Sequence, residues 1–390
     1  MQRSLVGSEM CIRDSNRMKK KKIFIYIHQC ILKGGVEKVF YNLLNNLPKG
    51  KYDVTILSIM GYLHGDINDN LYPAFVKRHW LYYDEWSNKW IVKLCQRFHN
   101  RFFPLLYKLY LKCCHFDVAI AAQEGVYAKF IDEKVKADKK ILWIHNDISI
   151  CHWTEKIFGS TENESACYKK FDSIVCVSES VKDSMNKVFG NLHNLCVCYN
   201  PIDTNEIDIK LKESLPERDK EILFVCVGRL ANQKGYDRLL DVCERLNIQG
   251  YKYSVWIIGE GEDRFLLEKI IAEKQLGNVK LLGLKSNPYI YMKQADWLLL
   301  PSRHEGFGMV LHEALYCGTP IITTLVAGAK ELLGESEYGI IVENSKEGIY
   351  KGMKSVLDDP KLHPKYVDMA AKRRSFVDIR KRVNDIESLF

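Results

Sequence analysis

The strongest constraint on the fold of this chain is an alternation of buried strands and amphipathic helices that occurs twice. In the first stretch, the helix predicted over 36–47 keeps apolar residues at i, i+3, i+4 and i+7. Short runs that are apolar on both faces predict strands at 21–28, 53–60, 116–122, 140–145, 173–178 and 195–199. Such strands, separated by helices, indicate a parallel sheet covered on both sides.

A polar segment at 203–221 breaks this alternation, which then restarts with a helix predicted over 235–246. The later strands are predicted at 221–228, 253–259, 279–283, 296–302, 319–324 and 339–343. The fold class is therefore α/β, with two doubly wound, Rossmann-like domains facing across a cleft. Ligands of such sheets bind beyond the carboxyl ends of the strands, so the cleft is the expected site.

The predicted domain organisation follows these breaks. We expect a Rossmann-like acceptor-binding domain at 18–202, a linker at 203–220, a second Rossmann-like domain at 221–375 and a C-terminal helix at 376–390 packing back on the first domain. Residues 1–15 resemble translated sequencing-adapter read-through and are excluded as non-native, with the native start expected near Met18.

Composition excludes several other classes of protein. The 390 residues are 47% hydrophobic and 27% charged, which is a globular composition. No apolar run reaches the ~18 residues that a membrane-spanning helix needs. The 13 cysteines form neither a CxxC pair nor a zinc-like cluster with histidine, which indicates free thiols in a reducing cytosol and no metal site.

Glycines and cations gather at the predicted strand ends. Gly34 and Gly35 precede the first helix, where backbone N–H groups can approach an anion, although an ordinary tight turn is the alternative. Arg229 and Lys234 flank the loop after the first strand of the second half. A guanidinium fork, an ammonium group and a helix N-terminus can together hold a diphosphate, and solvated surface charge is the alternative.

One glycine pair could instead indicate a dinucleotide-binding dehydrogenase. Gly259 and Gly261 fit the start of a dinucleotide fingerprint. Arg264 occupies the position of the third glycine, which disfavours a dehydrogenase.

The segment LPSRHEGFGMVLHEALYCGTP at 300–320 carries two glutamates. We expect a helix that begins near 307–309 and ends before Gly318, which puts Glu305 in a loop and Glu313 within the helix. Carboxylates suit the paired hydroxyls of a sugar, and amides at a helix start suit an oxyanion, so the segment predicts a nucleotide-sugar site. The alternative is a helix cap at Glu305 and a solvated Glu313.

Together these motifs resemble the family-4 glycosyltransferases, which have the two-Rossmann GT-B fold. GRLANQKG, IIGEGEDR, VKLLG, ADWLLLPSRHEGFGMVLHEALYCGTPII and GAKELL follow that family's order and spacing across 222–342. Glu305 and Glu313 match its E-x7-E motif. YNPID at 199–203 resembles its interdomain junction, and the first half matches through KGGVEKV and through WIHND at 143–147.

The resemblance implies roles for the loop and helix. Glu305 would hold the hydroxyls of the donor sugar, beside the amides of Gly306, Phe307 and Gly308. Glu313 would bind the ribose hydroxyls.

It also implies roles for residues outside that segment. Arg229 and Lys234 would neutralise the leaving diphosphate, while Gly34 and Gly35 would close on the phosphates from the opposite domain. His145, at a strand end, would lie near the donor sugar, with a buried structural histidine as the alternative.

The implied reaction is hexosyl transfer with retention of configuration. The family needs no divalent metal, and the chain has no DxD motif. Ala329, after Gly328, departs from the family's paired glycine, which leaves the role of Glu331 open. The co-substrate would be a nucleotide-diphosphate sugar, with UDP as the expected nucleotide, and no cofactor is implied. The acceptor would be a glycan or lipid-linked glycan, as in bacterial surface-polysaccharide synthesis.

Other functions compatible with the fold are a nucleotide-sugar epimerase and an inactive sugar-nucleotide-binding protein. The presence of Glu305, Glu313, Arg229 and Lys234 argues against the inactive protein.

Positive charge is concentrated in the first half. Residues 16–200 carry 27 Lys/Arg and 18 Asp/Glu, whereas residues 201–390 carry 28 and 29. The segment 86–116 has no acid, and aromatic and leucine residues separate its cations, which are Lys89, Lys93, Arg97, Arg101, Lys108 and Lys112. Pro104 is expected to interrupt its helix.

This pattern is typical of an interfacial helix on anionic lipid, and a core-facing helix with a solvated basic face is the alternative. No nucleic-acid motif accompanies the charge, so a nucleic-acid partner is not expected. The predicted localisation is cytoplasmic, with peripheral binding to the inner face of the plasma membrane as a hypothesis.

Overall fold

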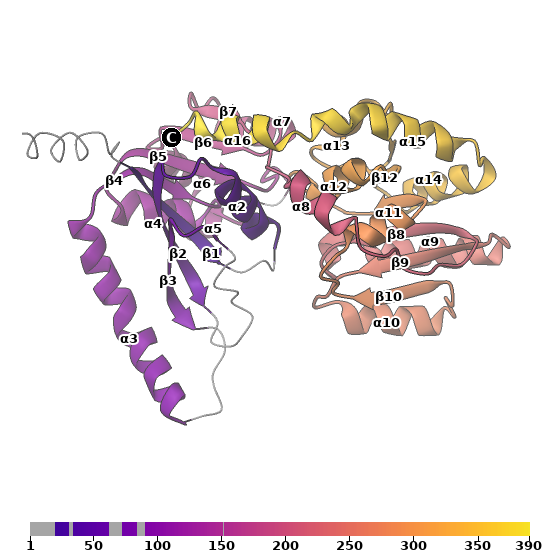
Figure 1. Cartoon of the computed structure of the whole chain (residues 1–390), viewed down its shortest axis with the longest axis horizontal. Helices are drawn as coiled ribbons and strands as arrows, with labels where there is room; N and C mark the ends of the chain where they lie inside the picture. The colour runs from indigo at the N-terminus through magenta and orange to yellow at the C-terminus, as the bar shows by residue number, and fades with distance from the viewer. Residues whose placement is uncertain (1–19, 31–33, 62–71, 84–89, 151) are drawn as a thin grey trace, which may run out of the picture. The chain divides into compact units, whose positions relative to one another are not determined.

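The computed structural model contains two parallel β-sheets (Figure 1). It describes residues 20–30, 34–61, 72–83, 90–150 and 152–390. The seven-stranded sheet has the order β3-β2-β1-β4-β5-β6-β7, and the six-stranded sheet has the order β10-β9-β8-β11-β12-β13. The predicted α/β class with two Rossmann-like sheets is confirmed.

The seven-stranded sheet is built around β1, whose residues 23–27 are all buried. Its strands are β1 (Lys21–Gln29), β2 (Tyr52–Gly61), β3 (Val76–Tyr83), β4 (Phe116–Ala121), β5 (Ala137–Ile144), β6 (Ser173–Cys176) and β7 (Leu195–Val197). β1 pairs in parallel with β2 on one side and β4 on the other. Burial of consecutive residues is what the uninterrupted apolar runs predict for a central parallel strand.

The helices of this part of the chain are α2 (Gly35–Asn46), α3 (Trp90–Cys113), α4 (Val126–Lys134), α5 (Glu155–Phe158), α6 (Thr161–Tyr168) and α7 (Glu179–Phe189). α2 buries the apolar face that its periodicity predicts, including Val39, Phe40 and Leu43. The expected interruption at Pro104 is wrong, because α3 continues through it. A proline removes one backbone hydrogen bond, and the buried packing of Tyr107 and Leu111 on the same helix keeps the helix in place.

The six-stranded sheet separates two apolar clusters. Its strands are β8 (Ile222–Val227), β9 (Tyr253–Ile258), β10 (Val279–Gly283), β11 (Trp297–Leu300), β12 (Ile321–Thr324) and β13 (Ile340–Val342). In β8, Phe224 and Cys226 join one cluster and Leu223 and Val225 join the other. Both faces are therefore covered, as the sequence predicts.

The remaining elements are α8 (Thr204–Lys210), η1 (Asn232–Lys234), α9 (Tyr236–Ile248), α10 (Arg264–Glu273), α11 (Tyr289–Gln294), α12 (Met309–Cys317), α13 (Ala329–Leu333), α14 (Lys346–Asp358), α15 (Leu362–Arg373), η2 (Arg374–Phe376) and α16 (Ile379–Glu387). The polar segment predicted as a linker contains α8. The Asp203 side chain caps this helix by accepting the N–H of Glu206 at 3.0 Å.

The described residues divide into two compact units, within each of which the residues contact one another extensively. The first contains the residues up to Trp143 together with Ala166–Ile174 and Leu389–Phe390, and the second contains Ile144–Ser165 and Val175–Ser388. Within the first unit, Lys21 Nζ donates a hydrogen bond to the Phe390 carbonyl at 2.8 Å. Among the helices that the structure describes, none is both long and apolar enough to cross a membrane.

Candidate active site

The loop between β11 and α12 ends at a sharply turned glycine. Gly308 has φ 66° and precedes the first residue of α12, and Gly318, with φ 77°, follows the last. Glu305 therefore lies in the loop and Glu313 inside the helix. No side chain caps α12, so Glu305 is not a cap, and Glu313 is 6% exposed, so it is not solvated. Both alternatives considered for these glutamates are wrong.

The Glu305 carboxylate is held by two donors. Its Oε1 accepts hydrogen bonds from Lys234 Nζ at 2.6 Å and from Ser302 Oγ at 2.6 Å. The side chains of Glu305 and Lys234 are 9% and 17% exposed. A carboxylate at this depth needs such partners, because an unpaired buried charge is strongly destabilising. Sequence reasoning selected Glu305 and Lys234 separately and missed both their pairing and Ser302.

Contacts between the loop around η1 and the loop at 301–305 hold this pair in place. The Arg303 backbone N–H donates to the Gln233 carbonyl at 2.8 Å, and the Arg303 guanidinium forms two 2.7 Å hydrogen bonds with Asp237. Gly235 has φ 67°, and a Cβ there would lie 2.3 Å from the Pro301 carbonyl oxygen. Glycine is thus required for the two loops to approach.

Arg229 differs from Lys234 in its surroundings. It is exposed, and in the described part of the chain it forms no ion pair.

The glycine pair Gly259 and Gly261 lies against neighbouring backbone. A Cβ at Gly259 would lie 2.0 Å from the Gly228 carbonyl oxygen, and one at Gly261 would lie 2.3 Å from the Leu230 carbonyl oxygen. These glycines therefore have a packing role, since backbone meets backbone at both.

Gly306 lies against the ends of β5 and β6, within the second compact unit. A Cβ at Gly306 would lie only 1.6 Å from the His145 carbonyl oxygen. The Gly306 carbonyl accepts a hydrogen bond from Ser178 Oγ at 2.9 Å. The structure thus brings His145, which is 9% exposed, beside the Glu305 loop through its backbone.

The Phe307 side chain holds the loop in position by packing against aromatic rings. It is 4% exposed, and its ring stacks on His312 with centroids 4.0 Å apart and on Tyr199 at 5.8 Å. His312 Nδ1 lies 3.2 Å from the Gly308 carbonyl oxygen, and burial, followed by the nearby Arg382 cation, holds the pKa of His312 well below its usual value. A neutral imidazole therefore supports the ring.

Glu331, whose role the sequence left open, complements the start of α7. Its carboxylate accepts the backbone N–H groups of Glu179 at 2.9 Å and Ser180 at 3.1 Å. A carboxylate at a helix N-terminus is stabilised by unsatisfied amides and by the helix dipole. Gly328 has φ 78°, and its Cβ would lie 2.9 Å from the Phe307 carbonyl oxygen.

Gly34 and Gly35 lie in the first unit, at the start of α2, where Gly34 is the N-cap residue. A Cβ at Gly34 would lie 2.5 Å from a carboxylate oxygen of Glu37, whereas one at Gly35 would meet nothing within 4 Å. Burial raises the pKa of Glu37. The helix start is therefore occupied on the Gly34 side by the chain's own carboxylate.

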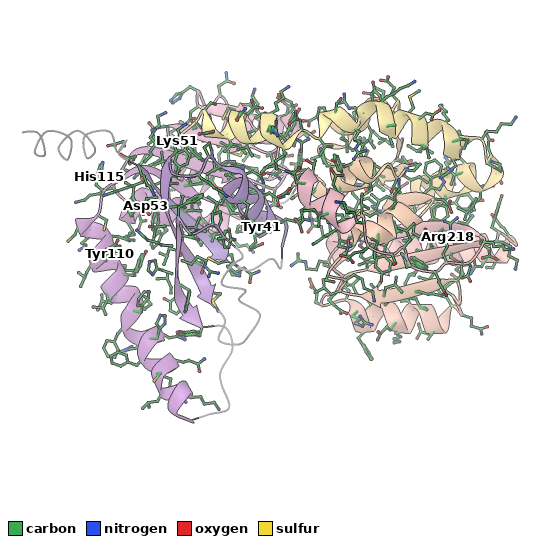
Figure 2. The ribbon with its side chains drawn as sticks, in the orientation of Figure 1. Tyr41, Lys51, Asp53, Tyr110, His115 and Arg218 are labelled. Atoms are coloured by element: carbon green, nitrogen blue, oxygen red, sulfur yellow. The ribbon has the colours of Figure 1, made fainter. Side chains whose placement is uncertain are left out.

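Helix α3, which belongs to the basic segment 86–116, has an unusual surface composition. One side of α3 packs on β3: the ring of Tyr107 lies 5.5 Å from that of His79, and the ring of His99 lies 4.8 Å from that of Tyr83. The other side leaves large apolar residues exposed: Leu94, Phe98, Phe102, Leu105, Leu106, Leu109 and Tyr110. Tyr110 is 51% exposed and is labelled in Figure 2. Lys89 falls outside the described residues.

Two family models match the chain. The model for glycosyl transferases group 1 matches residues 208–374, and the model for Glycosyltransferase Family 4 matches residues 33–206.

Among curated proteins, a relative from Campylobacter jejuni is 33% identical over 235 residues, which are 58% of this chain and 63% of that protein. It is the N-acetylgalactosamine-N,N'-diacetylbacillosaminyl-diphospho-undecaprenol 4-alpha-N-acetylgalactosaminyltransferase. The match thus spans less than two thirds of that relative's length. An uncharacterized glycosyltransferase of Haemophilus influenzae is 27% identical over 363 residues, covering 91% of this chain and 94% of that protein.

Among solved structures, the crystal structure of HepE from Anabaena in complex with UDP and glucose matches with a TM-score of 0.70 and 16% identity. The match covers 94% of this chain and 98% of HepE, and at that identity it supports the fold alone. The two family models leave only residue 207 unmatched between 33 and 374, and the solved relatives share the fold. The chain therefore belongs to the family-4, group 1 glycosyltransferases, which have the GT-B fold.

Proposed function

We propose that this glycosyltransferase moves a hexosyl residue, with retention of configuration, from a nucleotide-diphosphate sugar to a hydroxyl of a glycan or lipid-linked glycan. The observation that carries the proposal is the buried Glu305 carboxylate, held by Lys234 and Ser302 just ahead of α12. One arrangement offers an acceptor for sugar hydroxyls, a cation for phosphate and the amides of a helix start.

The chemistry assigns a task to each of these groups. When the bond between the sugar and the diphosphate breaks, the electron pair moves to a phosphate oxygen and positive charge develops on the sugar ring. The acceptor oxygen then bonds to the anomeric carbon, and its proton passes to the leaving diphosphate. Lys234 and the exposed Arg229 neutralise the leaving diphosphate, and preorganised cations are effective because they need no rearrangement during the reaction. Glu305 binds the sugar hydroxyls and so fixes the orientation of the ring. No metal is assigned to the site.

The nucleotide and the acceptor are the finer part of the proposal. UDP is supported by the bound nucleotide named for HepE, whose fold is shared. A lipid-linked acceptor is supported by the diphospho-undecaprenol substrate in the name of the Campylobacter relative. We assign Glu313, buried on α12, to the ribose hydroxyls and the backbone of His145 to the surroundings of the donor sugar. Of the glycine pair, we assign Gly35 to the donor phosphates, because the Glu37 carboxylate occupies the Gly34 side of the helix start.

The exposed face of α3 supports a membrane-bound acceptor. At about 100° per residue, Lys93, Arg97, Arg101, Lys108 and Lys112 fall in one sector of the helix, and all five are exposed. The exposed apolar residues occupy the adjoining sector. Cations beside an apolar stripe match an anionic lipid surface, where ammonium groups meet lipid phosphates and apolar side chains enter the acyl boundary.

A donor screen tests the proposed chemistry. Thermal unfolding and slow donor hydrolysis are measured with UDP-glucose, UDP-galactose, UDP-N-acetylglucosamine, UDP-N-acetylgalactosamine and GDP-mannose. We expect one UDP-sugar to raise the unfolding midpoint and to be hydrolysed, and Glu305→Ala to lower hydrolysis by about a hundredfold or more. Stabilisation by a donor without turnover would identify an inactive binding protein, and a response to GDP-mannose alone would correct the nucleotide.

A further inference from the structure

A buried arginine that forms no ion pair with the described residues lies beside Phe307 of the Glu305 loop. Arg382, on α16, is 3% exposed. Its Nη1 donates to the Asn200 carbonyl at 2.7 Å and its Nη2 to the Phe376 carbonyl at 3.1 Å. It forms no ion pair with any residue that the structure describes. Burial lowers its pKa to about 10, against smaller raising effects from Tyr199 and the Asp378 carboxylate. Buried guanidinium groups are ordinarily paired, so this one is costly to keep.

Aromatic rings take the place of a carboxylate around this cation. The guanidinium carbon lies 5.5 Å from the ring centroids of Phe307 and Phe376 and 5.8 Å from that of Tyr199. The faces of aromatic rings attract cations, and the attraction is larger where water is excluded. Phe307 is thus enclosed by Tyr199 and Arg382, with His312 stacked at 4.0 Å.

Arg382 connects three segments that are far apart in the sequence. Asn200 belongs to the YNPID junction, Phe307 to the loop that carries Glu305, and Arg382 to the C-terminal helix. Phe307 is two residues from Glu305, and its carbonyl lies against Gly328. Movement of the Phe307 ring would therefore carry the Glu305 carboxylate and the amides of the loop with it.

A role in stability alone does not account for this arginine. Replacing a whole buried ion pair by apolar side chains is commonly neutral or stabilising, and replacing Arg382 would leave no ion-pair partner unpaired among the described residues. A methionine would fill the space between the three rings without desolvating a charge, although the Asn200 and Phe376 carbonyls would lose their hydrogen bonds to Arg382. Unlike methionine, the guanidinium combines an attraction to the Phe307 ring with hydrogen bonds to two backbone carbonyls.

We propose that Arg382 is a positioning residue for glycosyl transfer, which holds Phe307 so that Glu305 and the amides of the loop keep the geometry that the donor requires. The inference rests on the function proposed for Glu305.

The test compares Arg382→Met with Arg380→Met, a matched control at an exposed position of the same helix. We expect Arg382→Met to unfold near the wild-type midpoint, because relief of the buried charge offsets the loss of two hydrogen bonds. Its kcat should fall about tenfold to a hundredfold, because small displacements of reacting groups have effects of that size. Its donor KM should change much less than its kcat, and Arg380→Met should match the wild type in both constants.

A second pair of variants guards against misfolding. Arg382→Lys keeps the charge but loses the planar contacts, and Phe307→Leu removes the ring. If the two side chains act together, the kcat of the double variant Arg382→Lys/Phe307→Leu should be little lower than that of either single variant. The reason is that the effects of changing contacting residues do not add. Fully additive losses of kcat would overturn the inference.

Two outcomes separate this inference from the proposed function. If the wild type transfers sugar and Arg382→Met does so equally fast, the positioning role fails while the glycosyltransferase assignment stands. If the wild type transfers sugar from none of the donors, the proposed function is overturned and the positioning role with it.

Discussion

Helices α12 and α3 depart from the usual arrangement of side chains in opposite directions. Around α12 polar groups are buried: Ser302, Glu305, His312 and Glu313 are each at most 9% exposed. Along α3 large apolar groups are exposed: Leu94 and Phe98, for instance, are 61% and 65% exposed. Both arrangements are unfavourable for a chain alone in water, one through desolvated polar atoms and the other through hydrated apolar surface.

The difference between the two helices is the basis for proposing a different kind of partner for each. A buried carboxylate with its own cation and hydroxyl donor is suited to a small polar ligand that offers hydroxyls and phosphates. An exposed apolar stripe beside a row of cations is suited to an extended surface that is apolar inside and anionic outside. In globular proteins, buried polar groups and contiguous exposed apolar patches are the informative exceptions to ordinary burial. If the two exceptions are independent, a change at either helix leaves the function of the other unaltered.

The largest effect is expected at the buried pair. Glu305→Ala and Lys234→Ala should each lower kcat/KM by about a hundredfold or more, as the loss of a preorganised transition-state contact does. The measurement is initial rate against donor concentration. Lys330 and Glu335 form an exposed ion pair at 2.9 Å and provide the control, since replacing either by alanine should leave the rate unchanged. Wild-type turnover in Glu305→Ala would exclude it from the reaction.

On α3 we expect an effect on membrane binding and none on the chemistry. Phe98→Ser combined with Leu105→Ser should weaken binding to vesicles of anionic phosphatidylglycerol by at least tenfold, because each buried large apolar side chain contributes about 1.5–3 kcal/mol. Co-sedimentation measures the binding. Turnover with a water-soluble acceptor should stay at the wild-type value.

Its control is Ile248→Ser, which alters an apolar residue that is 81% exposed on α9. This variant should bind vesicles like the wild type. Neutral phosphatidylcholine vesicles should bind the wild type less than anionic ones do, and raised salt should narrow that gap. Equal binding to both lipids would remove the basic sector of α3 from the explanation.

Glu313 should show a smaller effect of another kind. Because the ribose is remote from the bond that breaks, Glu313→Gln should raise the donor KM by about tenfold and leave kcat within about threefold, the signature of lost uniform binding. Steady-state kinetics separates the two constants. A loss confined to kcat would instead give Glu313 a part in the chemical step.

The smallest effect concerns acid stability around Phe307. The pKa of His312 is lowered by burial and by Arg382, so below about pH 6.5 the unfolded chain binds a proton that the folded chain does not. The free energy of unfolding should therefore fall as pH drops below that value, by at most about 1.4 kcal/mol per pH unit from this residue.

Urea unfolding at pH 7.5, 6.5 and 5.5 measures this dependence. His312→Phe keeps an aromatic ring against Phe307 and should lose the part of the slope that His312 contributes. Parallel slopes in the two proteins would mean that His312 is protonated in the folded state as readily as in the unfolded one.

Local patterns predicted the sheets because burial on both faces leaves uninterrupted apolar runs such as KKIFIYIH. They did not predict β3, whose VKRHWLYY mixes polar and apolar residues and is largely half-buried along its length. The positions of Glu305 and Glu313 on either side of the start of α12 followed from Gly308 and Gly318.

What could not be predicted depends on contacts between distant residues. Lys234 and Glu305 are 71 positions apart, and no periodicity relates them. Arg382 lies on an ordinary amphipathic helix, where its position marks it only as one of several cations. Its burial depends on Asn200, Tyr199 and Phe307, which the tertiary structure brings together.

The length of α3 has a consequence for how this enzyme would meet its acceptor. With 24 residues it is about 36 Å long, at 1.5 Å per residue. Lying flat, such a helix covers several lipid headgroups in a row and limits tilting of the protein along its axis. A lipid-linked acceptor and an enzyme held in this way would search for each other in two dimensions, and their effective concentration would be raised as if the two were tethered.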